Sequence, residues 1–198
     1  MERGSRLETH AVSRRFVLVD RDGTINEEIS PEYVLEPDQI RLLPGAARAL
    51  RELREIGLGV VVVTNQSPVG RGWITADQLD TIHARLSELL HAEGAAVDGF
   101  YVCPHVPGDG CDCRKPEVGL ALRAAAEHGF DPAEAFVVGD HPGDVEMGRR
   151  IGAGTFQVRT GHGMEEIAEG GPPADHVVQD LAEAARIIRA EVLAGAGR

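Results

Sequence analysis

The stretch FVLVDRDGTIN, residues 16–26, decides the fold of this chain. Its four leading apolar residues run directly into Asp20, and a short apolar run of this kind is typical of a strand buried on both faces of a parallel sheet. Gly23 lets the chain turn sharply after the strand. Asp20 and Asp22 stand two residues apart, so both carboxylates can face a metal ion and a phosphate at the end of that strand.

Strands and helices alternate outward from this stretch. Short apolar runs predict further strands at 59–64, 99–103, 135–139, 154–158 and 176–178. Apolar stripes at helical spacing, with a capping box from Thr75 to Gln78, predict helices at 45–56, 75–90, 120–128, 142–151 and 181–192. This alternation specifies an α/β fold, a Rossmann-like parallel sheet with helices on both faces. The Gly- and Pro-rich segment 161–173 is expected to form a surface loop.

Length and charge limit the classes of protein to which the chain can belong. Its 198 residues suit a flexible N-terminal tail, 1–14, and a single domain, 15–194. The formal charge of −12 argues against a nucleic-acid-binding protein, which needs a basic surface. We find neither an apolar run long enough to span a membrane nor the apolar core of a secretory signal. A cytoplasmic monomer is therefore expected.

All three cysteines fall in one short segment with a histidine. Cys103, His105, Cys111 and Cys113 form a CxH…CxC pattern, and three sulfurs with one imidazole match a closed tetrahedral zinc site. Four protein ligands leave no open coordination position, so this Zn²⁺ is expected to be structural. Its expected task is to hold the loop that leads into Arg114.

Polar residues follow three of the predicted strands at their carboxyl ends, where open α/β sheets bind ligands. Beside Asp20 these are Thr64, which begins the segment TNQS, and Asp140, which begins DHPGD. Hydroxyl and backbone N–H groups can bind phosphoryl oxygens, and carboxylates suit Mg²⁺. Lys115, which follows the cysteine loop, can neutralise a transferring phosphoryl group.

The histidines and Asp144 allow less specific readings. Asp144 is expected in or near the second coordination sphere of a metal ion, or as a cap of the following helix. His141 is expected to face the pocket because it follows Asp140. The remaining histidines outside the cysteine loop are expected at the surface or at element edges: His10, His83, His91, His128, His162 and His176.

The motifs DRDGTIN, VVVTNQS, CPH…CDCRKP and GD together resemble the haloacid dehalogenase (HAD) superfamily. Over about residues 17–178 the chain is similar to the D-glycero-D-manno-heptose 1,7-bisphosphate 7-phosphatases within it. It is also similar to the histidinol-phosphate phosphatases, in which the spacing between His105 and Cys111 is likewise short. His141 stands where the heptose family often has lysine, and residues 28–33 depart from the usual His-Gly-Tyr of that family.

The resemblance implies a Mg²⁺-dependent phosphatase without a large cap domain, acting on a small phosphorylated sugar through an aspartyl-phosphate. The implied substrate is heptose 1,7-bisphosphate, in nucleotide-activated heptose biosynthesis. Histidinol phosphate is the alternative, and a catalytically dead, zinc-stabilised binding domain is a third. The implied roles are as follows: Asp20 is the nucleophile, Asp22 the general acid and base, and Thr64 and Lys115 stabilise the phosphoryl group; Asn65, Gln66, Ser67, Arg114 and His141 bind substrate; Asp20, the Asp22 carbonyl and Asp140 hold Mg²⁺; Cys103, His105, Cys111 and Cys113 hold Zn²⁺.

Overall fold

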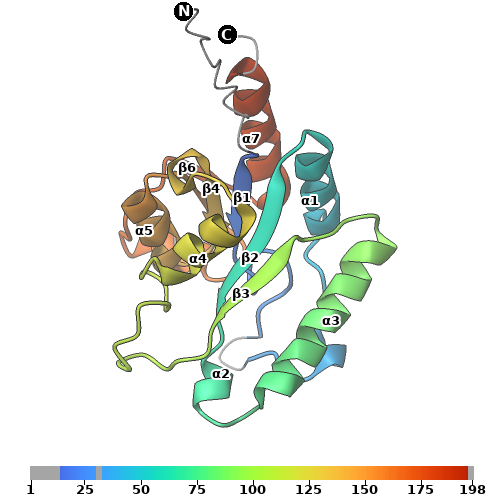
Figure 1. The fold of residues 1–198 in the computed structure, drawn as a ribbon, viewed down its shortest axis with the longest axis vertical. Coiled ribbons are helices and arrows are strands. Elements are labelled where there is room, and N and C mark those ends of the chain that lie inside the picture. Colours follow the sequence, from blue (N-terminus) through green and yellow to red (C-terminus); the bar gives the residue numbers. More distant parts are fainter. Residues whose placement is uncertain (1–13, 30–32, 196–198) are drawn as a thin grey trace, which may run out of the picture.

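The computed structural model describes residues 14–29 and 33–195, and Figure 1 shows its arrangement. The expected N-terminal tail lies outside these residues except for Arg14. The Arg14 side chain donates hydrogen bonds to the backbone carbonyls of Gly57 and Leu58, at 3.1 and 2.8 Å.

A six-stranded parallel sheet forms the centre of the structure, in the order β3-β2-β1-β4-β5-β6. Its strands lie within one residue of the predicted positions: β1 (Phe16–Val19), β2 (Gly59–Asn65), β3 (Gly99–Cys103), β4 (Phe136–Gly139), β5 (Gly154–Val158) and β6 (His176–Val178). All five neighbouring pairs are parallel. The predicted fold class is therefore confirmed.

Helices cover both faces of the sheet, with α1 and α3 on one side of it and α4 and α5 on the other in Figure 1. The Thr75–Gln78 capping box begins the longest of them, as predicted. The helices are α1 (Ala46–Glu55), α2 (Ser67–Gly70), α3 (Ala76–Ala92), α4 (Gly119–His128), α5 (Pro142–Ile151), α6 (Gly163–Ala168) and α7 (Leu181–Gly195), with 3₁₀ turns η1 (Pro37–Gln39) and η2 (Pro132–Glu134).

Alternate residues of β1 serve two hydrophobic cores, one on each face of the sheet. Val17 and Val19 pack into a core with apolar residues of α1, α3 and α7. Phe16 and Leu18 pack on the opposite face with α4 and Met147 of α5. Burial on both faces explains why the strand is apolar at every position rather than at every second one.

One predicted loop contains a helix. Within 161–173, which we expected to be a surface loop, residues Gly163–Ala168 form α6. Isolated helices of this length are unstable in water, so local sequence gives them little signal. Here contact with β5 supports the helix, and its N-terminal end lies beside the carboxyl ends of the strands.

The order of the strands fixes where a ligand can bind. The chain builds the sheet outward from β1 to β3 and then returns to add β4 on the other side of β1. The connections above β1 and β4 therefore diverge and leave a crevice between them, the usual ligand site of an open α/β sheet. Asp20 and Asp140 follow these two strands, and the Asp20 amide donates to the Val138 carbonyl at 2.9 Å.

Candidate active site

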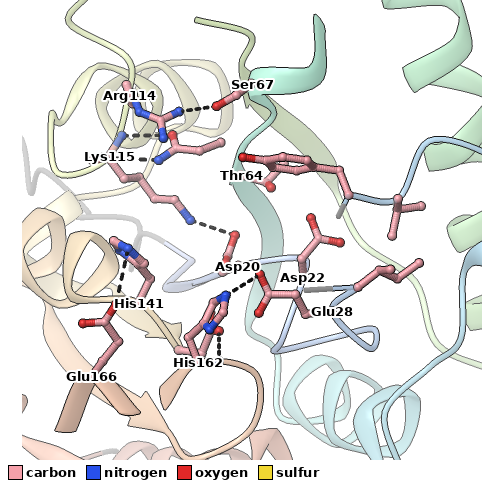
Figure 2. Close-up of a pocket in the computed structure, with 15 residues that line it drawn as sticks. Asp20, Asp22, Glu28, Thr64, Ser67, Arg114, Lys115, His141, His162 and Glu166 are labelled. Carbon is pink, nitrogen blue, oxygen red and sulfur yellow. Dashed lines mark hydrogen bonds and ion pairs between the residues drawn. The ribbon is translucent and has the colours of Figure 1, made fainter. Parts of the chain in front are cut away.

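A cavity of about 340 Å³ opens at this carboxyl edge, and Figure 2 shows side chains from five separate segments converging on it. The cavity brings together all four expected catalytic residues and most of the expected substrate-binding ones: Asp20, Asp22, Thr64 and Lys115 with Asn65, Ser67, Arg114 and His141. Asp140 lines it too. Gln66 is buried and is not among the lining residues. It reaches the site only by donating hydrogen bonds to two lining residues, Asp22 and Thr64.

Lys115 lies between the aspartates that follow β1 and β4. Its Nζ donates to Asp20 Oδ1 at 2.7 Å, to Asp144 Oδ1 at 2.5 Å and to the Val63 carbonyl at 2.7 Å. Burial lowers the pKa of Lys115, but the charges of Asp144 and Asp20 outweigh it and raise that pKa above its usual value. Lys115 therefore stays cationic where a phosphoryl group beside Asp20 would lie.

Three carboxylates gather beside this lysine. Oxygens of Asp20, Asp140 and Asp144 lie within 4.8 Å of one another. Burial and the charges of the other two raise the pKa of Asp140 well above its usual value. Burial also raises the pKa of Asp144 to about 7, although Lys115 opposes the shift. Crowded carboxylates with raised pKa values favour a bound cation, and an all-oxygen donor set fits Mg²⁺.

Asp144 combines the two roles that its position in the sequence allowed. As the third residue of α5 it accepts a hydrogen bond from the His141 amide at 3.3 Å, and the His141 side chain accepts one from Gly143. The same carboxylate contacts Lys115 and belongs to the carboxylate cluster. Asp144 thus ties the start of α5 to the candidate metal site.

A pair of glycines closes over Asp140. The His162 amide donates to Asp140 Oδ2 at 2.9 Å. Gly23 and Gly161 both have positive φ, and a Cβ on either would lie within 2.4 Å of that carboxylate oxygen. Only glycine permits this close approach of two loops in a left-handed conformation.

A buried arginine fixes the position of the Asp22 carboxylate. Arg21 is fully buried and donates to both Asp22 oxygens, at 3.1 and 2.7 Å. Asn26 and Gln66 donate to the same carboxylate, each at 2.9 Å. Burial tends to raise the pKa of Asp22, but the Arg21 charge and these hydrogen bonds outweigh it and hold the pKa below its usual value.

The segment after β2 positions the lysine loop. Asn65 Oδ1 accepts from the Lys115 amide at 3.1 Å, and Asn65 Nδ2 donates to the Lys115 carbonyl at 3.3 Å. Ser67 Oγ accepts from Arg114 Nη1 at 3.0 Å, a contact drawn in Figure 2. The buried Thr64 hydroxyl accepts from Gln66 at 2.9 Å. The expected phosphate-binding segment therefore fixes the cationic loop as well as lining the cavity.

The cysteine loop forms a compact cluster. Single ligand atoms of Cys103, His105, Cys111 and Cys113 lie within 4.8 Å of one another. The Cys103 and Cys111 sulfurs are 3.7 Å apart, close to the edge of about 3.8 Å of a tetrahedron with Zn–S bonds of about 2.3 Å. The cluster can therefore bind zinc. It also anchors the loop, because the His105 carbonyl accepts from Arg114 at 3.1 Å.

Two histidine–carboxylate pairs stand at the mouth of the cavity. His162 Nε2 lies 3.0 Å from Glu28 Oε1, and His141 Nε2 lies 3.7 Å from Glu166 Oε1 (Figure 2). Burial raises the pKa of Glu28 more than the His162 charge lowers it, and nearby aspartates raise it further. Burial lowers the pKa of His141 despite Glu166. The mouth thus offers both acceptors and donors to a polar ligand.

Several of these residues were not predicted from the sequence. We expected His83 and His162 at the surface or at element edges. His83 is instead buried, whereas His162 lies at the N-terminal edge of α6 and also lines the cavity. Glu28 and Glu166 had no distinguishing pattern, and α6, which carries Glu166, was not predicted. Arg21 carried no such pattern either, because arginine is usually exposed and only the structure shows this one fully buried.

The family model described as HAD-hydrolase-like matches residues 112–184. Two relatives are similar over most of the chain. The D-glycero-β-D-manno-heptose-1,7-bisphosphate 7-phosphatase of Pseudomonas putida is 39% identical over 173 residues, which cover 87% of this chain and 98% of that protein. The D-glycero-α-D-manno-heptose-1,7-bisphosphate 7-phosphatase of Mycobacterium tuberculosis is 42% identical over 138 residues, covering 69% and 73%.

A solved structure shows the same similarity in three dimensions. The crystal structure of D,D-heptose 1,7-bisphosphate phosphatase from Bordetella bronchiseptica, complexed with magnesium and phosphate, superposes with a TM-score of 0.84 at 35% identity. The superposition covers 89% of this chain and 99% of that one. None of the helices in the described part of the chain has the length and apolar character of a membrane span.

Proposed function

The chain belongs to the D-glycero-D-manno-heptose-1,7-bisphosphate 7-phosphatase family of HAD-like hydrolases, and we propose that it hydrolyses the C7 phosphate of heptose 1,7-bisphosphate. One observation carries the proposal. The Asp20 carboxylate lines the cavity at the switch point of the sheet, 2.7 Å from the Lys115 ammonium. A nucleophile next to a fixed cation is the arrangement that phosphoryl transfer requires.

Mg²⁺ would be held by Asp20 and Asp140, with Asp144 beside them and, by family resemblance, the carbonyl of Asp22. When bound, Mg²⁺ offsets negative charge on the phosphoryl oxygens and on the three carboxylates. Zn²⁺ would be held by the CxH…CxC cluster, where it would fix the loop that presents Arg114 and Lys115.

The reaction would proceed in two steps on the chain's own residues. An Asp20 oxygen attacks phosphorus and forms an aspartyl-phosphate, while Asp22 gives a proton to the leaving C7 oxygen. Asp22 then takes a proton from the water that hydrolyses this intermediate. Lys115 and the Thr64 hydroxyl stabilise charge on the phosphoryl oxygens in both steps.

The low pKa of Asp22 in the free protein sets a condition on this scheme. A carboxyl group must hold a proton before it can give one to a leaving group. A phosphate dianion bound beside Asp20 and Lys115 would bring negative charge toward Asp22, and a nearby like charge raises the pKa of a carboxyl group. Substrate binding itself would thus favour protonation of Asp22.

The mouth of the cavity would contact the sugar and its second phosphate. Arg114, which is held by Ser67, is a candidate partner for the C1 phosphate. Glu28, His141, His162 and Glu166 stand where sugar hydroxyl groups would lie and can accept or donate hydrogen bonds. All these residues come from one chain, so we propose that a monomer suffices. We also propose a cytoplasmic location, which keeps the cysteines reduced.

The test measures phosphate release with Mg²⁺ and compares kcat/KM for both anomers of heptose 1,7-bisphosphate with that for histidinol phosphate. We expect a preference for one heptose anomer, and we expect Asp20→Asn to abolish turnover. A preference for histidinol phosphate would refute the substrate and retain the chemistry. Absence of release from every ester, or full turnover by Asp20→Asn, would refute the phosphatase proposal itself.

A further inference from the structure

Asp22 lies at the end of a chain of contacts that crosses from the sheet to α3. Its carboxylate receives two hydrogen bonds from the Arg21 guanidinium, at 3.1 and 2.7 Å. This paired geometry fixes the plane of the carboxylate as well as its position. Whatever fixes the Arg21 guanidinium therefore also fixes Asp22.

The Arg21 guanidinium has two further partners, and each comes from a different part of the fold. Gln66, after β2, accepts from Nη2 at 3.1 Å. His83, in the middle of α3, has its Nε2 3.2 Å from Nη1. Arg21 is fully buried, and an unpaired buried charge is costly, so these contacts determine how the guanidinium is oriented.

His83 is suited to be a fixed acceptor. Its ring stacks on Phe100 of β3, with centroids 4.4 Å apart and planes 9° apart. The side chain is buried, and burial together with the Arg21 charge lowers its pKa to about 3. The ring is therefore neutral and can offer the lone pair of Nε2 to Arg21, with its proton on Nδ1.

We propose that His83 is a positioning residue for acid–base chemistry: by accepting a hydrogen bond from Arg21, it fixes the guanidinium that holds the Asp22 carboxylate toward the leaving group. The inference rests on the proposed phosphatase function, and it assigns to α3 a part in catalysis although His83 does not line the cavity. His83 does not contact the substrate in this scheme. Its effect passes entirely through Arg21 and Asp22.

The alternative is that His83 only fills the space between α3 and β3. The two explanations predict different effects of the leaving group on kcat/KM. An alkyl phosphate needs a proton on its leaving oxygen, whereas p-nitrophenyl phosphate has a good leaving group and needs little help. kcat/KM covers the steps up to transfer of the phosphoryl group to Asp20. A loss of acid catalysis lowers kcat/KM for the alkyl ester selectively, whereas a packing defect lowers both values by a similar factor.

The experiment measures kcat/KM for heptose 1,7-bisphosphate and p-nitrophenyl phosphate with the full-length chain and Mg²⁺. We expect His83→Leu to lower the ratio of the two values about tenfold, part of the roughly 100- to 10,000-fold that a positioned acid contributes. His83→Gln, whose amide oxygen can accept from Arg21, should restore most of the ratio. His91→Leu, an exposed histidine of the same helix, is the matched control and should leave it unchanged.

A second measurement covers the case in which the leucine variant folds poorly. In an Asp22→Asn background, His83→Gln and His83→Leu should have equal kcat/KM for the heptose substrate when the rate is expressed per folded protein, since the group they position is gone. An unchanged ratio in folded His83→Leu, or an equal loss with and without Asp22, would overturn the inference. Inactivity of the unmodified protein toward every ester would instead refute the proposed function.

Discussion

Replacing Lys115 with methionine is the sharpest test of the site, because it removes one charge and keeps most of the side-chain volume. The Lys115 ammonium lies 2.7 Å from Asp20 and 2.5 Å from Asp144, so a phosphoryl oxygen beside Asp20 would lie within about 4 Å of it. Two unit charges at about 4 Å interact by about 4 kcal/mol at an effective dielectric constant of about 20. Loss of that stabilisation in the transition state corresponds to about a 1,000-fold fall in kcat/KM.

The same change should also destabilise the fold. Asp144 is 2% exposed and would lose its only charged partner among the described residues. Breaking a buried ion pair costs about 3–5 kcal/mol, and protonation of Asp144 would reduce that cost. Steady-state kinetics with Mg²⁺ would therefore be measured well below the Tm of the variant. Arg123→Met is the matched control: its ion pair with Glu127 is exposed, so we expect less than a twofold change.

Lys115 is the only lysine in the chain, which provides an independent check of its environment. Reductive methylation should modify Lys115 only after unfolding, as mass spectrometry would show. A folded Lys115→Met protein with more than a tenth of the original kcat/KM would refute the assignment of Lys115 to the phosphoryl group. Ready methylation of Lys115 in the native protein would refute its buried ion pairs.

Three further predictions concern the metal sites and pH. Gly161→Ala should raise the Mg²⁺ concentration for half-maximal activity about tenfold, because strain of about 1–2 kcal/mol and a clash displace Asp140. Gly170→Ala, which is also at a positive φ but has open space around it, should leave that concentration unchanged. Metal analysis should find about one zinc ion per chain in the unmodified protein, and Cys111→Ser should lose it, with a lower Tm because the loop is released. The pKa of His83 is 6.5 in the unfolded chain and about 3 in the native protein, so between these pH values only the unfolded chain binds a proton there. The free energy of unfolding therefore falls as the pH drops below 6.5. Urea unfolding should show that His83→Gln lacks this loss of about 2 kcal/mol at pH 5, and identical pH slopes would contradict a buried neutral ring.

Local sequence predicted the strands well because each carries its own signal. The run 16–19 is apolar at all four positions, and the alternation of such runs with amphipathic helices leaves few topologies open. The end of each strand then located the polar groups. Asp20, Thr64 and Asp140 were expected at one edge because parallel strands end on the same side of a sheet, and the structure places them there.

The partners of these groups were not predictable in the same way. Glu28 and His162 are more than a hundred residues apart in the chain, and nothing in either local pattern indicates that they pair. We expected His83 at the surface or at an element edge, which is the usual rule for an isolated histidine. The rule failed because Nη1 of the buried Arg21 finds its acceptor on α3, at His83 Nε2.

The sequence by itself determined the fold class, the motifs that we assign to phosphoryl transfer and the four-residue pattern of the cysteine loop, because periodicity and ligand spacing are properties of short segments. Only the tertiary structure decided which charges meet. It placed Lys115 between Asp20 and Asp144, closed two glycines over Asp140, and held Asp22 through Arg21. These arrangements depend on how the ends of β1, β2 and β4 converge, and burial there makes each charge depend on partners that lie far away in the chain.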